Sequence, residues 1–429
     1  MTLSRRQAIA AALAAPVAAS AARAAGAAAP TLPDKAAFAA TPLAYLDNAA
    51  THPISLGAQA AIAAYVAGRT MDPAAAARPR TDMGAVLAKF ARLVNAAPDE
   101  VTWVQSTTMG EQMVLRAMGY PDQHVGKAGG RLVTDTLHFF ASFPMYAEMA
   151  KQGVDVHWVR DRDGRIDLDD MRRAIVPGTK LVCLSLVSTV NGFRHDLKAV
   201  CDMAHGVGAL VYADIIHAAG AVPIDLHGSG VDFAACATYK WLMGDFGLGF
   251  LYVRREVLSR LPRTQYGFYG FAAPGAADIG PRLSEPQTHV YPFDPPGKGA
   301  SDIVDYAVKR GAIGQFATGT YSHAVPAQLD HSLDYIGGIG VERIQAHAQA
   351  LLAPLREELP RRGYRLMTPP GTATPLLACA LADAKGVLAD PLAKARVRIS
   401  LSENRFRVSP SVHNDMRDIE RLIAALPRL

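Results

Sequence analysis

One lysine, Lys240, has the neighbours that a reactive amine needs. It follows the apolar run 233–237 and is followed at once by further apolar residues. Burial lowers the pKa of an ammonium group, and the neutral amine is then a nucleophile that forms a Schiff base with an aldehyde. Asp214 ends a second apolar run, 210–213, where a carboxylate can pair with a protonated ring nitrogen. Taken singly, Lys240 is typical of a surface lysine and Asp214 of a turn or helix cap.

The chain around these two residues alternates strand-like apolar runs with helical patterns. Strands are predicted at 44–47, 101–104, 131–134, 154–159, 180–187, 210–213, 233–237 and 249–253. Helices are predicted at 55–66, 86–93, 111–118, 146–152 and 197–205. This alternation favours a mainly parallel sheet with helices on both faces. Ligands of such sheets bind beyond the C-terminal strand ends, where Asp214 and Lys240 both lie.

The last third of the chain has a different pattern. From about residue 312 we expect a smaller α+β domain, with helices at 328–336, 342–352 and 415–426 and strands at 376–381, 396–400 and 405–409. Before it, residues 264–300 are rich in Gly, Pro, Tyr and Phe and have little periodicity. A loop of this length is usually functional, so we expect Tyr266, Tyr269 and His289 to contribute to substrate specificity. The domain prediction is therefore 1–24 export signal, 25–45 N-terminal arm, 46–311 large domain and 312–429 small domain.

The first residues have the pattern of a targeting signal. Arg5 and Arg6 precede the Ala-rich apolar stretch 8–22, and Ala22-Arg23-Ala24 follows as a cleavage triplet. This pattern predicts a twin-arginine export signal and a periplasmic or secreted protein, with no membrane anchoring after cleavage. Ala8 stands where that signal usually has a large apolar residue. A disordered Ala-rich tail is the alternative.

Composition excludes several classes of function. Half of the 429 residues are hydrophobic and 19% are charged, so the chain can build a large core. Leaving out the three arginines of the first 24 residues lowers the net charge from +5 to +2, and no basic block points to nucleic acid. The four cysteines form no CxxC pair and the histidines form no HExxH motif, so we predict no metal. The absence of GxGxxG after an early strand argues against an NAD-dependent dehydrogenase.

A phosphate seat is predicted at residues 105–111, with the sequence Gln-Ser-Thr-Thr-Met-Gly-Glu. The segment lies between a predicted strand and a predicted helix. Backbone N–H groups at a helix start, together with the hydroxyls of Thr107 and Thr108, suit a phosphate. An ordinary Ser/Thr helix cap is the simpler interpretation.

The segment 236–242, Cys-Ala-Thr-Tyr-Lys-Trp-Leu, and the run 214–217, Asp-Ile-Ile-His, closely resemble the class V aminotransferase family of pyridoxal-phosphate enzymes. That family includes cysteine desulfurases, kynureninases and isopenicillin N epimerases. The resemblance extends from Tyr45-Leu46-Asp47-Asn48-Ala49-Ala50 to the C-terminal helix. It implies an α/β protein of fold type I, with a mainly parallel seven-stranded sheet, helices on both faces and a smaller C-terminal α+β domain.

The resemblance also implies roles for individual residues. Lys240 would bind pyridoxal 5'-phosphate as an aldimine and shuttle protons, while Asp214 would pair with the pyridine nitrogen and His217 with the phenolic oxygen. Thr107, Thr108 and Tyr239 would hold the phosphate, and either His138 or Phe139 would stack on the ring. Thr320, in a Thr-Gly-Thr, would reach the phosphate of a neighbouring subunit, which implies a homodimer with shared active sites.

Substrate contacts follow from the same resemblance. Arg407, within Arg405-Phe406-Arg407-Val408-Ser409, would bind the α-carboxylate of an amino-acid substrate, with Arg405 as the rival. Asn48 and Asn191 would lie beside the substrate.

One departure concerns sulfur chemistry. Residues 400–404 contain no cysteine where desulfurases of the family carry their nucleophile, and Cys379 is in a predicted apolar strand. Persulfide chemistry is therefore disfavoured, and aminotransfer is the expected reaction. Racemisation of the isopenicillin N epimerase kind and a kynureninase-like or carbon–sulfur lyase reaction are the alternatives. A non-catalytic binding protein on the same fold is less favoured because Lys240, Asp214 and Arg407 are all present.

Overall fold

The computed structural model describes residues 30–71, 81–124, 126, 130–276, 285–290, 293–298 and 301–429. The predicted export signal with Arg5 and Arg6 lies outside these residues, as do parts of the 25–45 arm and of the 264–300 loop. Within the described ranges, every helix is too short or too polar to span a bilayer.

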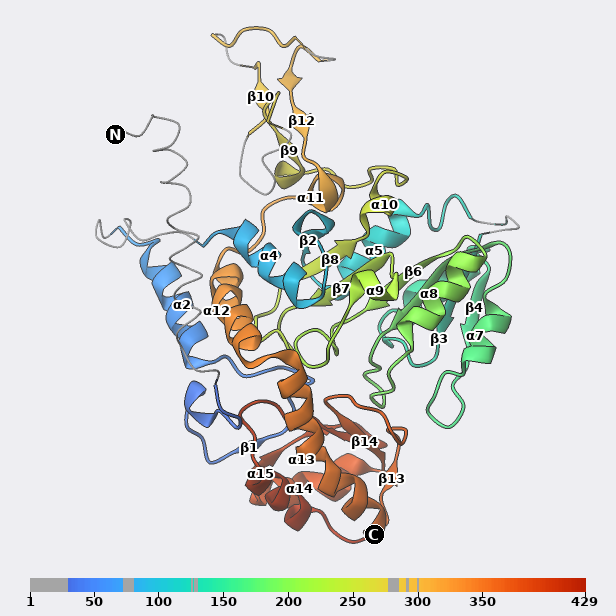
Figure 1. The fold of residues 1–429 in the computed structure, drawn as a ribbon, viewed down its shortest axis with the longest axis vertical. Helices are drawn as coiled ribbons and strands as arrows, with labels where there is room; N and C mark the ends of the chain where they lie inside the picture. Colours follow the sequence, from blue (N-terminus) through green and yellow to red (C-terminus); the bar gives the residue numbers. More distant parts are fainter. Residues whose placement is uncertain are drawn as a thin grey trace, which may run out of the picture.

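The large sheet has seven strands in the order β2-β8-β7-β6-β5-β3-β4 (Figure 1). Their bounds are β2 (Val101–Val104), β3 (Arg131–Asp135), β4 (Val156–Val159), β5 (Thr179–Ser185), β6 (Leu210–Asp214), β7 (Phe233–Ala237) and β8 (Gly249–Val253). Only β8 runs antiparallel to its neighbours, β2 and β7. The predicted mainly parallel sheet is confirmed.

Alternate residues of each strand enter two separate cores, one on each face of the sheet. In β5, Val182 and Leu184 pack in one core with α4 (Met83–Leu93), α8 (Leu197–Gly206) and α12 (Ala324–Ile339). Leu181 and Cys183 pack in the other core with α5 (Thr107–Ala117) and α6 (Phe143–Lys151). This is the two-sided burial expected for a mainly parallel sheet. The helices before the small sheet are α2 (Leu56–Ala67), α4 (Met83–Leu93), α5 (Thr107–Ala117), α6 (Phe143–Lys151), α7 (Leu168–Ala174), α8 (Leu197–Gly206), α9 (Leu226–Ser229), α10 (Arg255–Leu258), α11 (Gly311–Phe316) and α12 (Ala324–Ile339).

The C-terminal region contains a four-stranded antiparallel sheet in the order β13-β14-β17-β16. Its strands are β13 (Arg365–Leu366), β14 (Leu377–Ala380), β16 (Ser400–Leu401) and β17 (Arg405–Val408), and its helices are α13 (Val341–Arg361), α14 (Ala384–Lys394) and α15 (Met416–Ala425). The expected strand at 396–400 is divided, because β15 (Val397–Arg398) leaves this sheet to pair with β1 (Ala44–Tyr45). The boundary at residue 312 stays a prediction.

The N-terminal segment lies against the C-terminal sheet. β1 runs parallel to β15, and Asn48 Nδ2 donates to the Ser409 carbonyl at 2.8 Å, one residue beyond β17. These contacts join segments more than 350 residues apart in the sequence. They fix the position of β17, which carries Arg407.

The 264–300 stretch contains regular structure that the sequence did not indicate. After the short helix η3 (Phe268–Gly270), β9 (Phe271–Ala272) pairs with β12 (Ala307–Val308), and β10 (Gln287–Thr288) pairs with β11 (Val304–Asp305). Figure 1 shows these strands extending away from the large sheet beyond α11. The remaining short helices are η1 (Lys35–Ala37) and η2 (Pro98–Glu100).

Gly110 allows α5 to pack closely on β7. A Cβ added at this position would lie 2.8 Å from the Cβ of Ala235. We expect Gly110→Ala to lower the free energy of unfolding by about 1–3 kcal/mol, because overpacking outweighs the better helix propensity of alanine. Urea unfolding of the purified protein measures the change.

The matched control is Gly338→Ala in α12, where an added Cβ meets nothing within 4 Å. This variant should be more stable by roughly 0.5–1 kcal/mol because of helix propensity alone. Stabilisation by both substitutions would show that the contact of α5 with β7 is not tight.

Candidate active site

Lys240 lies in a tight turn between β7 and β8. The Met243 N–H donates to the Lys240 carbonyl at 2.8 Å, and Met243 has a left-handed φ of 55°. The carbonyl of Met243 accepts hydrogen bonds from Gln328 (2.9 Å) and Ser332 (3.0 Å) of α12. A helix from a distant part of the sequence therefore fixes the backbone of the lysine turn.

The loop after β6 packs directly against this turn. Gly220 has a φ of +91°, and a Cβ there would lie 2.5 Å from the Trp241 carbonyl oxygen. Only glycine permits this approach of the two backbones. It places His217 beside the lysine, with Nε2 3.0 Å from Lys240 Nζ.

The lysine amine is largely shielded from water. Lys240 is only 7% exposed, and burial lowers the pKa of its amine to about 8. The Asp214 charge opposes this shift, and the Arg407 charge adds to it. Burial, Lys240 and Arg407 hold the pKa of His217 well below its ordinary value, so its imidazole is neutral. A substantial fraction of the amine is therefore neutral near pH 8.

Asp214 ends β6 with its carboxylate buried near the lysine. Its Oδ1 accepts the Ile216 N–H at 2.9 Å. Burial raises the pKa of Asp214 to about 6, against the opposing charges of His138 and Lys240. Above that pH the group is a carboxylate, as the predicted pairing with a ring nitrogen requires.

His138 is completely buried and held through both ring nitrogens. Nδ1 lies 2.9 Å from Ser185 Oγ, and Nε2 lies 3.0 Å from Glu111 Oε1. The Glu111 carboxylate also accepts hydrogen bonds from Ser142 (2.7 Å) and from the Tyr146 hydroxyl. Burial lowers the pKa of His138, but the charge and hydrogen bond of Glu111 more than offset it, so the net shift is upward.

Glu111 and His138 thus form a buried ion pair. Burial raises the pKa of Glu111, and the combined effect of His138 and the two hydroxyl donors leaves it below its ordinary value. The sequence places Glu111 at the end of the phosphate motif and at the start of a predicted helix, and gives no sign of this pairing. Phe139 is half-buried, with its ring 4.9 Å from that of Phe140. Whether His138 or Phe139 stacks on the cofactor stays a prediction.

The N-terminus of α5 lies next to the end of β7. Thr107 Oγ1 accepts the Ala237 N–H at 2.9 Å, so this hydroxyl joins the helix to the strand. Thr108 is half-buried, and its hydroxyl has no hydrogen bond to any described residue. Ser106 caps the helix by accepting the Met109 N–H at 3.1 Å. The Thr108 hydroxyl is therefore more available to bind a phosphate than the Thr107 hydroxyl.

Tyr239 lies immediately before the lysine with its ring stacked on Phe246, at 4.2 Å between centroids. Lys240 Nζ lies 5.6 Å from the centroid of the same ring. The Tyr239 carbonyl accepts the His52 N–H at 3.0 Å, which ties the N-terminal segment to the lysine turn. The predicted phosphate contact of Tyr239 stays a prediction.

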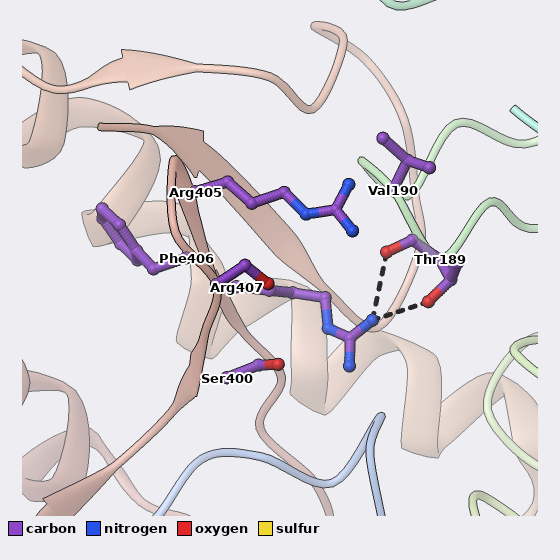
Figure 2. A pocket seen from close by; sticks show the side chains of 7 residues that line it. Thr189, Val190, Ser400, Arg405, Phe406 and Arg407 are labelled. Carbon is purple, nitrogen blue, oxygen red and sulfur yellow. Dashed lines mark hydrogen bonds between the residues drawn. The ribbon is translucent and has the colours of Figure 1, made fainter. Parts of the chain in front are cut away.

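Arg407 approaches the site from the small sheet. Its Nη1 donates to the Thr189 carbonyl (3.0 Å) and hydroxyl (2.8 Å), as Figure 2 shows. Its Nε is buried without a hydrogen-bond partner among the described residues. Burial lowers the pKa of Arg407 to about 10, opposed by Asp47 and reinforced by Arg405. The group stays charged, with one edge available for an anion.

The three remaining predicted site residues are Asn191, Asn48 and Thr320. Asn191 uses both ends of its amide in contacts with the backbone, donating to the Gly164 carbonyl of the turn before α7 (2.7 Å) and accepting the Phe193 N–H (2.9 Å). Asn48 donates to the Ser409 carbonyl, but its Oδ1 is buried without a partner in the described part of the chain. Thr320 is exposed. Their predicted ligand contacts remain predictions.

These groups fit pyridoxal phosphate. Lys240 supplies the amine, Asp214 the carboxylate and the start of α5 the phosphate seat. The clearest sign of a missing polar partner is Nδ1 of His217, which is buried without a hydrogen bond to the described residues. The described residues contain no cluster of three or more His, Cys, Asp or Glu side chains that suits a metal ion.

Comparison with known proteins identifies the family of the chain. The family model described as aminotransferase class-V matches residues 44–273. A probable cysteine desulfurase of Methanothermobacter thermautotrophicus is 26% identical over 317 residues, covering 72% of this chain and 71% of that protein.

Two solved structures share the fold. The cysteine desulfurase CsdA from Escherichia coli has a TM-score of 0.75 at 21% identity, covering 92% of this chain and 98% of that one. A C-DES mutant with glycine covalently linked to its pyridoxal-phosphate cofactor has a TM-score of 0.70 at 17% identity, covering 89% and 95%. The predicted fold type I architecture is confirmed.

The lowered pKa of Lys240 can be measured by chemical labelling. We expect reductive labelling of Lys240 by a small aldehyde to accelerate with pH around a midpoint near 8, because only the neutral amine reacts. Asp214→Asn should move the midpoint to lower pH, since the Asp214 carboxylate raises this pKa. Mass spectrometry of the labelled peptides gives the rates.

Exposed Lys198 serves as the internal control. Asp202 raises its pKa, so its labelling should accelerate at distinctly higher pH. Equal midpoints for Lys198 and Lys240 would contradict the claim that burial activates Lys240.

Proposed function

The chain belongs to the class-V aminotransferase family, and from this membership we infer that it is a pyridoxal-phosphate enzyme that transfers the amino group of an amino acid to a keto acid. Pyridoxal phosphate is its cofactor. When bound through Lys240, it supplies an electron sink for the electron pair released at the substrate α-carbon. The grouping of His217, Asp214 and Arg407 close to the buried amine of Lys240 carries this proposal.

Lys240 is the group that moves the α-proton. Its Nζ accepts the proton in the neutral form, and the pKa of about 8 keeps that form accessible near neutral pH. Neutral His217, 3.0 Å away, holds the amine without adding a competing positive charge. The Asp214 carboxylate balances positive charge at the base of the site.

Arg407 orients the substrate. Nη1 is held by Thr189, which leaves Nε and Nη2, the two donors on one edge of the guanidinium, for a bidentate contact with the α-carboxylate. Thr189 therefore fixes the plane in which the substrate binds. Small errors in this orientation are costly in rate.

The cysteines argue against transfer of sulfur to the protein. All four are buried as free thiols. Cys379 in β14 is 0% exposed, and burial raises its pKa to about 12, whereas a nucleophilic cysteine needs an accessible thiolate. The turn between β16 and β17 consists of residues 402–404 and contains no cysteine. These facts favour aminotransfer over persulfide chemistry.

A substrate panel tests the proposal. The cofactor-loaded protein is incubated with single amino acids, with and without a keto acid, and the products are analysed by chiral chromatography. We expect a new amino acid only when both substrates are present. Lys240→Ala should slow the reaction by about 10²–10⁴-fold or more, because it removes the acid–base group, whereas exposed Lys198→Ala should leave the rate unchanged.

Other products would overturn aminotransfer. Loss of optical activity without a keto acid identifies a racemase or epimerase. Release of sulfide, alanine or pyruvate identifies a lyase.

We also propose a homodimer with shared active sites. Support comes from Thr320, which is exposed in the chain between α11 and α12 and is therefore free to reach a second subunit. Thr320→Ala should weaken cofactor binding by about tenfold, the effect of losing a hydrogen bond to a charged group. Cofactor titration and analytical ultracentrifugation measure affinity and assembly.

Mixed dimers give the sharper test. A dimer of one Lys240→Ala chain and one Thr320→Ala chain contains one intact site only if Thr320 acts across the interface. Recovery of tight cofactor binding on mixing is expected. A monomer, or mixing without recovery, would contradict the shared site.

A further inference from the structure

Two arginines line one small cavity beside the active site. Arg405 and Arg407 lie two residues apart on β17, and their side chains extend in the same direction toward the loop of Thr189 and Val190 (Figure 2). The cavity has a volume of about 30 Å³, and its lining also includes Ser400 and Ser402. Guanidinium groups donate hydrogen bonds and never accept them, so this lining favours an anion.

The positive charge of this pair is only partly balanced by nearby carboxylates. Among the described residues, Arg405 has no side-chain hydrogen bond or ion pair. Arg407 feels the charge of Asp47, and the charge of Arg405 works against it. Two guanidinium groups this close repel each other unless an anion lies between or beside them. A second anionic group on the substrate would relieve this repulsion.

The strands leave room for both side chains. On β14, Ala378 pairs with Arg407 and Ala380 pairs with Arg405, so each arginine has a small cross-strand neighbour. Residues two apart on one strand share a face and lie about 7 Å apart. Flexible guanidinium groups at this spacing can each bind one end of a short dicarboxylate.

The two arginines lie at different depths. The charge of Arg407 acts on the pKa values of Lys240 and His217, and its guanidinium contacts Thr189. Arg405 lies two residues before Arg407 on the same face of β17. This order matches an amino acid whose side chain ends in a second acid.

We propose that the substrate is a dicarboxylic amino acid, with its α-carboxylate bound by Arg407 and its side-chain carboxylate bound by Arg405. The assignment rests on the proposed function and names its substrate class. Arg405 is then a specificity-determining residue of the same site.

Matched substrate pairs test this assignment in the cofactor-loaded enzyme. We expect kcat/KM for aspartate and glutamate to exceed that for asparagine and glutamine by about 10–100-fold, the effect of one charge-assisted hydrogen bond. Arg405→Gln should remove this preference by lowering kcat/KM for the acidic substrates far more than for the amide substrates. Arg405→Lys should retain part of it, because the charge remains but the fork geometry is lost.

Arg365→Gln is the matched control. This arginine is exposed on the neighbouring part of the same sheet, paired with Ala380, and does not line the cavity. The Arg365→Gln enzyme should keep the full preference for acidic over amide substrates. Equal losses for acidic and amide substrates in Arg405→Gln would indicate a structural role and overturn the proposal.

Binding without turnover gives an independent readout. Glutarate should bind at least about tenfold more tightly than butyrate by calorimetry, and Arg405→Gln should abolish the difference. Aminotransfer with no preference for acidic substrates would overturn this inference and leave the proposed function standing. No aminotransfer with any substrate, combined with a retained glutarate preference, would overturn the proposed function and leave the dianion site standing.

Discussion

The structure depends on keeping one amine out of water. Lys240 is removed from solvent, placed 3.0 Å from a neutral imidazole and held between the charges of Asp214 and Arg407. Desolvation of an ammonium group costs free energy, so the surrounding elements must hold it firmly. The contacts of α12 with Met243 and the close approach of Gly220 to Trp241 meet this need.

Sequence reasoning predicted the elements whose pattern is local. The strands β2, β7 and β8 have the predicted bounds, because short apolar runs between turn signals mark fully buried strands. The helices α7 and α14 were not predicted, nor were the short strand pairs that join residues 271–288 to residues 304–308. α7 has only seven residues and α14 contains Pro391, so both helices have a weak local signal, whereas each of the short strands pairs with a partner more than 15 residues away.

The candidate site divides in the same way. Lys240, Asp214 and His217 follow strands directly, so their convergence could be predicted from strand order alone. The Glu111–His138 pair could not, because a carboxylate on a helix gives no indication that it meets a histidine 27 residues later. Nor does sequence reveal that Asn191 uses its amide to join its own loop to Gly164, 27 residues earlier in the chain.

The pairing of β1 with β15 has a consequence for biosynthesis. Residues 44–45 pair with 397–398, and Asn48 is bound to Ser409, so the N-terminal segment cannot pack in its final position until residue 409 has left the ribosome. That segment also reaches the lysine turn through His52. Closure of the catalytic centre is therefore a post-translational event, and a nascent chain exposes an incomplete pocket throughout its synthesis.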